Sequence, residues 1–191
     1  MGQILLGALA FAVAFAFDWA SWLHLPRLKP LLGLSSVGLF ASAFVWTLAT
    51  PGRLHWPAWT SMAGWPLLLV AGALLVYSLF IEIPFVATYA RPGVGDTLVK
   101  SGTYALVRHP GVLWFGLWVL ACTMVSRGRL LLLAGAVWLV LDVIYVWLQE
   151  AFLFPRMFPG YAAYQRETPM LVPTWGSLAA CLRTWPRRSS P

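Results

Sequence analysis

Long apolar runs separated by short polar breaks are the feature that most restricts how this chain folds. Of its 191 residues, 60% are hydrophobic and only 10% are charged, whereas soluble domains average about 45–50% apolar and about 25% charged residues. Too few polar side chains remain to cover a water-soluble globule of this size. The composition therefore excludes an ordinary soluble enzyme and a disordered regulator, and it indicates an integral membrane protein.

Five of the apolar runs are long enough, or nearly so, to cross a bilayer as helices, which takes roughly 20 residues each. The predicted spans are 4–23, 31–50, 65–88, 112–125 and 130–154. The first run lacks the basic segment and cleavage site of a signal peptide. We predict an all-α integral membrane bundle of about five transmembrane helices, in which residues 1–88 supply three helices and residues 89–191 form the functional core.

The cations are unevenly divided between the two sides of this predicted bundle. If the N-terminus lies outside, the outer loops hold only Arg53, Arg127 and Arg129, and the other ten of the 13 Lys and Arg residues lie inside. Those ten are Arg27, Lys29, Arg91, Lys100, Arg108, Arg156, Arg166, Arg183, Arg187 and Arg188. This is a strong positive-inside signal, so we expect an outside N-terminus. The cations are also too scattered for a nucleic-acid partner, which needs them clustered on one face.

Four acidic residues lie inside the predicted spans, where an ionisable group marks a functional site or a buried polar pair. We expect Asp18, Glu82 and Glu150 near the cytosolic ends of their helices and Asp142 deeper in the bilayer. Pro84 is expected to kink the third helix close to Glu82. Snorkelling or helix pairing by Asp18 and Glu82 is an alternative that the sequence leaves open.

A polar loop containing glycine leads into the fourth span at Pro110. Proline suits the first turn of a helix, because its missing N–H would be unpaired there in any case. The free N–H groups and the positive dipole end of that helix favour a nearby anion. Arg108 adds a planar donor fork that matches a carboxylate. The residues alone thus predict an anion site at the inner face of the membrane.

The same loop carries a more specific pattern. The stretch LVKSGTYALVRHPG, which begins at Leu98, resembles the signature of the isoprenylcysteine carboxyl methyltransferase family and its relatives, the membrane phospholipid and thiol methyltransferases. The resemblance extends over residues 88–173, nearly half of the chain. Its later elements are Glu150, Phe158, Gly160, Tyr161, Tyr164, Pro169 and Pro173.

This resemblance implies that S-adenosylmethionine binds at the cytosolic face, is converted to S-adenosylhomocysteine, and methylates a lipophilic acceptor drawn from the bilayer. By position, the residues that would line the cofactor pocket are Leu98, Val99, Tyr104, Arg108, His109 and Pro110. Glu150 would hold the amino group or the ribose of the cofactor, opposite the carboxylate on Arg108. A cytosolic C-terminal segment would complete the pocket. Gly93 and Gly95 lack the third glycine of a soluble dinucleotide-binding fingerprint.

Two departures from the family pattern bear on the acceptor. The acidic pair of the family appears here as Gln149-Glu150, and Gln149 takes the acidic position if the alignment shifts by one residue. Residues 142–148 lack the arginine that would hold a prenylcysteine carboxylate. Because an unpaired anion in an apolar cleft is costly, we expect a neutral amine, hydroxyl or thiol acceptor, with Tyr145 and Trp147 as its wall. For an amine or alcohol, Glu150 or His109 would accept the proton.

The competing interpretation is a non-catalytic membrane protein, a carrier or assembly factor that retains a methyltransferase-like shell. Loss of the second acid and of the arginine is what such a protein would display.

Two cysteines, Cys122 and Cys181, are too few for a zinc site or a disulfide framework, so no metal is expected. The preponderance of arginine over lysine favours a bacterial inner membrane over the endoplasmic reticulum, and the basic tail at Arg187 and Arg188 is expected to contact anionic lipids.

Overall fold

The computed structural model describes residues 1–25, 27–83 and 98–185, and the secondary-structure elements in these ranges are all helices. They are α1 (Gly2–Trp22), α2 (Leu28–Ala49), α3 (Ala58–Val76), η1 (Tyr77–Glu82), α4 (Thr103–Leu106), α5 (Pro110–Ser126), α6 (Arg129–Leu148), η3 (Gln149–Leu153), α7 (Phe154–Met157), α8 (Tyr161–Glu167) and α9 (Trp175–Thr184). The elements η1 and η3 are π-helices. The prediction of an all-α chain is confirmed for the described residues.

Four helical stretches are long and apolar enough to cross a membrane. They are Gly2–Trp22, Leu28–Ala49, Ala58–Glu82 and Arg129–Met157, and the apolar helix α5 is shorter, as the sequence predicted for the fourth span. Helix α5 begins at Pro110, the position expected from the sequence. The end of the predicted third span, including Pro84 and its expected kink, lies outside the described residues, as do Gly93 and Gly95.

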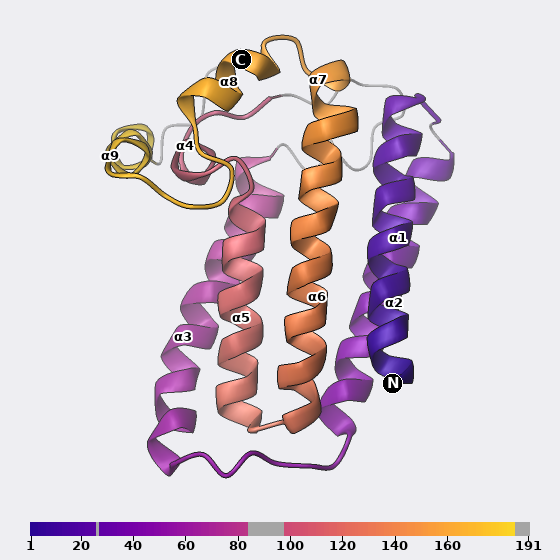
Figure 1. Ribbon diagram of the computed structural model, residues 1–191, viewed down its shortest axis with the longest axis vertical. Helices are drawn as coiled ribbons and strands as arrows, with labels where there is room; N and C mark the ends of the chain where they lie inside the picture. The colour runs from indigo at the N-terminus through magenta and orange to yellow at the C-terminus, as the bar shows by residue number, and fades with distance from the viewer. Residues whose placement is uncertain (26, 84–97, 186–191) are drawn as a thin grey trace.

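The long helices run roughly parallel to one axis (Figure 1). Helices α1, α3 and α6 end, and α5 begins, at what we call the upper end, and the N-terminus lies at the lower end. Helix α1 packs on α2 and α6, α6 packs on α5, and α3 packs mainly on α5. The connection from α2 to α3 therefore crosses the lower end, where the N–H of Leu54 donates to the Arg127 carbonyl at 2.7 Å and that of Arg129 donates to the Gly52 carbonyl at 3.0 Å.

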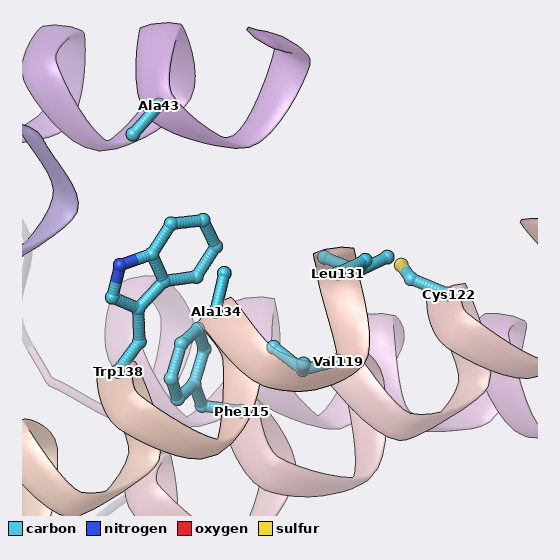
Figure 2. Packing of buried hydrophobic residues seen from close by; sticks show 7 residues of the cluster. All are labelled: Ala43, Phe115, Val119, Cys122, Leu131, Ala134 and Trp138. Carbon is cyan, nitrogen blue, oxygen red and sulfur yellow. The ribbon is translucent and has the colours of Figure 1, made fainter. Parts of the chain in front are cut away.

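The core lies where α2, α5 and α6 meet. Its buried residues are Ala43, Phe115, Val119, Cys122, Leu131, Ala134 and Trp138 (Figure 2). The indole N–H of Trp138 donates to the Ile4 carbonyl of α1 at 3.3 Å. A Cβ on Gly7 would lie 2.1 Å from the indole nitrogen, so α1 approaches α6 this closely only because Gly7 has no side chain. Such small residues are how helices associate within lipid, where no hydrophobic force drives them together.

The two π-helices both extend transmembrane helices at the upper end. Helix η1 continues α3 and ends at Glu82, while η3 continues α6 and contains Glu150. A π-segment rotates the following side chains relative to a regular helix, and such segments are frequent at functional sites. Hydropathy does not predict them. The two π-helices place Glu82 and Glu150 so that their side chains bond to the segment 102–109, at Thr103 and Arg108.

We predict that Gly7→Ala destabilises the protein by about 1–3 kcal/mol, the usual cost of overpacking a core, because the added methyl group collides with Trp138. The matched control is Gly38→Ala on α2, since a Cβ there meets nothing within 4 Å. Thermal unfolding in detergent can be followed with a thiol-reactive dye, because both free cysteines are buried. Equal midpoints for the two variants would contradict this packing.

Candidate functional site

The carboxylate of Glu150 is the centre of a buried polar cluster at the upper end. Its side chain is 8% exposed, and it accepts five hydrogen bonds. Arg108 donates two of them, from Nε to Oε1 at 2.7 Å and from Nη2 to Oε2 at 2.9 Å. The others come from His109 Nε2 at 2.9 Å, the Tyr161 hydroxyl at 2.7 Å and the Gln165 amide at 2.7 Å. Five donors exceed the roughly four lone-pair positions of a carboxylate, so the acid is saturated.

Arg108 is held as firmly as its partner. Its Nη1 donates to the backbone carbonyls of Gln165, at 3.0 Å, and of Thr168. Together with the bidentate bond to Glu150, these contacts occupy four of the five N–H groups of the guanidinium. The main chain takes part as well, because the N–H of Arg108 donates to the Pro169 carbonyl at 2.9 Å. The segment after α8 thereby clamps the start of α5.

The charges in the cluster reinforce one another. Burial by itself lowers the pKa of Arg108, but the hydrogen bonds and the negative charge of Glu150 outweigh it and raise this pKa above its usual value. Burial, and then the bond to Glu150, raise the pKa of the Tyr161 hydroxyl. A phenolate beside a carboxylate would be repelled. Tyr161 therefore remains a protonated donor, and Arg108 remains a cation, throughout the physiological pH range.

Aromatic rings cover the cluster on the side of α7 and α8. The His109 ring stacks on Phe154 with centroids 5.8 Å apart, and Phe154 meets Tyr161 edge-on at 5.4 Å. The Tyr164 hydroxyl donates to the Tyr104 carbonyl at 2.6 Å. These rings exclude water from the ion pair, which strengthens the attraction between its charges.

Glu82 does not bond to Arg108 but to the first residue of α4. Its carboxylate accepts the backbone N–H of Thr103 at 2.9 Å and also the Thr103 hydroxyl, so it caps α4. A Cβ on Gly102 would lie 1.7 Å from a Glu82 oxygen, and Gly102 has φ of +60°. Both facts require glycine there. The glycine of the Gly-x-Tyr pattern is thus explained by the approach of Glu82.

Asp18 forms a third polar cluster at the same end, between α1 and α6. Its Oδ2 accepts the Tyr145 hydroxyl and the Gln149 amide, the latter at 2.7 Å. Gln149 and Glu150 are adjacent in the chain and yet serve different clusters. Of the two alignments that the sequence left open, the structure places Glu150, and not Gln149, against Arg108.

The structure brings some of the predicted site residues together and separates others. Arg108, His109 and Glu150 form one cluster, and the buried Pro110 starts α5 beside it. Leu98 and Val99 are half-buried where the described chain resumes. The two residues expected to form the acceptor wall lie apart, since Tyr145 donates to Asp18 on α1 while Trp147, on another side of α6, is 57% exposed.

A cofactor held between the two charges requires a gap that this arrangement lacks. We expected Arg108 to hold a carboxylate and Glu150 an amino or ribose group at opposite ends of one nucleoside. The two side chains instead bond directly to each other, with Arg108 Nε 2.7 Å from Glu150 Oε1. In this arrangement, Arg108 and Glu150 do not fit the expected role of holding the two ends of one cofactor. Likewise, neither oxygen of Glu150 is free to accept a proton from a substrate.

Sequence reasoning overlooked several partners in the cluster. Gln165 was not singled out, although it lies one helical turn after Tyr161 on α8, and both side chains donate to Glu150. That i, i+4 spacing of two donors on a short helix is the signal that points to a shared acceptor. In the neighbouring Glu82 cluster, the hydroxyls of Thr103 on α4 and Ser78 on η1 are 2.9 Å apart, and neither residue had a distinguishing pattern.

We predict that Glu150→Gln lowers the free energy of unfolding by about 3–5 kcal/mol, the usual cost of removing one partner from a buried ion pair. The new amide group would present its own donors to a site that already contains five. Glu167→Gln is the matched control, because Glu167 is exposed on α8. The midpoint of thermal unfolding in detergent measures both. A loss no greater than that of the control would show that the pair does not hold this end of the bundle.

Comparisons with known proteins add no assignment to this geometry. No protein-family model, no curated protein and no solved structure was found to match the chain. Within the described residues, no group of three or more His, Cys, Asp or Glu side chains is arranged to hold a metal ion. The function must therefore be argued from the polar clusters and from the sequence pattern that supplies them.

Proposed function

We propose that this chain is a membrane-embedded methyltransferase that takes a methyl group from S-adenosylmethionine and transfers it to a lipophilic acceptor. When bound, S-adenosylmethionine supplies a methyl group on a positively charged sulfonium. The proposal rests on the sequence pattern that contains Arg108 and Glu150, and it does not require the cofactor to bind between these two side chains. In this proposal, the cluster positions Tyr104 and the segment that follows Leu98.

One observation carries the proposal. The two parts of the sequence pattern are separated by the α5–α6 hairpin, and they meet in a single cluster through the Arg108–Glu150 pair. The tyrosines of the pattern also take part, since Tyr161 donates to Glu150 and Tyr164 donates to the Tyr104 carbonyl. Residues that match a motif by chance have no reason to contact each other. Their contact supports treating the pattern as one functional unit.

The distribution of cations supports a cytosolic position for this end. Among the described residues, Arg53, Arg127 and Arg129 lie at the lower end, in the loop before α3 and the turn before α6. The remaining described cations belong to segments at the upper end, namely Arg27, Lys29, Lys100, Arg108, Arg156, Arg166 and Arg183. A membrane protein retains the more basic side in the cytosol. We accordingly propose that the site faces the cytosol, in a bacterial inner membrane.

The acceptor is proposed to be neutral. Among the described residues, the cation nearest to Glu150 is already paired with it, and residues 142–148 contain no arginine or lysine. An acceptor with a free carboxylate would have to be buried without a counter-charge, which is costly in an apolar site. An amine, hydroxyl or thiol on a lipophilic molecule avoids that cost.

A second candidate has its own support. Arg108 and Glu150 are satisfied by each other and by α8, which is what a purely structural clamp requires. A non-catalytic membrane protein, such as a carrier or an assembly factor, would use the cluster to fasten its C-terminal segment. The two candidates differ in one measurable property, which is whether the folded chain binds the methyl donor.

We predict that the wild-type chain in lipid nanodiscs binds S-adenosylmethionine or S-adenosylhomocysteine saturably, as measured by titration calorimetry. Arg108→Ala is expected to weaken binding at least about tenfold, equal to about 1.4 kcal/mol, because the segment 98–109 loses its anchor. Arg156→Ala is the matched control, since Arg156 is exposed and its described hydrogen bond is to the Phe152 carbonyl within its own helical turn.

Binding is compared only on monodisperse protein, so that unfolding by Arg108→Ala is not counted as lost affinity. Membranes are then incubated with a methyl-labelled donor, and their lipids and thiols are analysed by mass spectrometry to find the acceptor. If the folded wild type shows no saturable binding, the methyltransferase proposal is overturned and the structural clamp remains. Binding without transfer of label to any lipid or thiol would also reject the proposed reaction.

A further inference from the structure

Helix α9 presents three distinct faces, although it is only ten residues long. The first face packs against α4 and contains the buried Ser177 and Cys181. Thr184, on the same face, accepts the backbone N–H of Gly102 at 2.9 Å. This face fastens α9 to the segment that leads to Arg108.

The second face is apolar and exposed. Trp175, Leu178 and Leu182 follow the i, i+3, i+7 spacing of a helical stripe. They are 88%, 38% and 69% exposed. At about 100° per residue, this stripe lies roughly a third of a turn away from the buried face. Val172, three residues before the helix begins, is also an exposed apolar residue.

The third face is narrow and polar or small. It comprises Gly176, Ala179 and Arg183, which continue around the helix beyond the apolar stripe. The Arg183 Nε donates to the Ala179 carbonyl at 3.1 Å, so the cation lies along this face and is exposed. A helix with one protein-facing side, one apolar side and one cationic side matches three surroundings, which are protein, lipid and water.

The position of α9 agrees with that assignment. Figure 1 shows α9 end-on at the upper end, so it runs crosswise to the bundle and along the plane of a membrane that the bundle spans. Trp185, which follows α9, stacks on Tyr77 with ring centroids 4.7 Å apart. Tyr77 belongs to the candidate span Ala58–Glu82. Helix α9 is therefore docked beside the last turns of a membrane helix.

Through Trp185 and Tyr77, α9 is joined to a span whose exposed apolar side chains face lipid. Val76 and Phe80 flank Tyr77 on α3 and η1, and both are largely exposed, as they are on a helix that faces acyl chains. Tryptophan is enriched at the boundary between the headgroups and the acyl chains. An exposed apolar stripe on a helix joined to such a span is covered most simply by the same lipid.

We infer that α9 is an in-plane helix of the membrane interface. Its stripe of Trp175, Leu178 and Leu182 lies in the boundary region of the leaflet at the upper end, and Arg183 faces the water. In-plane amphipathic helices likewise combine an apolar face with a basic polar face. The inference does not depend on the proposed methyltransferase activity, since it concerns the surface of α9 and not the Glu150 cluster.

The test places a nitroxide label on each exposed face of α9 in the full chain, reconstituted in nanodiscs of phosphatidylcholine and phosphatidylglycerol. Leu182→Cys carries the label on the apolar face, and Arg183→Cys is the matched control on the polar face. The native thiols are poor targets, because both are buried; for Cys181, burial and then the charge of Glu82 also raise the pKa. Labelling of the wild type measures any background.

Oxygen concentrates in lipid, whereas a nickel chelate stays in water, so relaxation of the label by each reports its surroundings. At residue 182, we expect oxygen to relax the label several-fold more effectively than the chelate does, and at residue 183 we expect the reverse. A label at 182 that the chelate reaches freely would overturn the inference. A label at 182 shielded from both reagents would also overturn it, since protein would then cover the stripe.

Discussion

A buried carboxylate must find donors within the protein, and the way Glu150 does so organises the whole upper end of this bundle. Taking Arg108 and Glu150 out of water is expensive, and their attraction offsets that cost only if the remaining donors and acceptors are also satisfied. Tyr161, Gln165 and the carbonyl of Thr168 meet that condition. The ion pair therefore fixes the position of α8, and the chain after it, relative to α5 and η3.

Glu82 supplies the second half of the same arrangement. It holds the beginning of the segment 102–109 by capping α4, while Glu150 holds the end of that segment through Arg108 and His109. The two acids come from η1 and η3, which extend α3 and α6, and Figure 1 shows these two helices on either side of α5. A segment tied at both ends to separate transmembrane helices is a rigid element. Rigid placement is what a binding site needs from its supporting residues.

The sequence predicts the long helices better than it predicts the polar contacts at the upper end. Apolar runs and Pro110 were enough to predict the four long apolar helices and the start of α5, although α3 begins at Ala58 and not at residue 65. Burial in lipid imposes a pattern on every residue of a span. Sequence reasoning did not predict which side chains bond to the buried acids Asp18, Glu82 and Glu150. Whether Glu150 meets Arg108 directly depends on the π-segment η3 and on the docking of α8, which hydropathy does not encode. Gln149 illustrates this, since only the turn of η3 decides that it serves Asp18.

The closed pair restricts what any ligand of this site can be. A ligand that carries one charge would take one partner and leave the other buried and unpaired, at a cost of about 3–5 kcal/mol. A neutral ligand gains nothing by opening the pair. Only a ligand with both charges can exchange one ion pair for two, as a zwitterion does. Because Arg108 and Glu150 are each also bonded to α8, such an exchange would have to preserve those bonds or loosen the C-terminal segment.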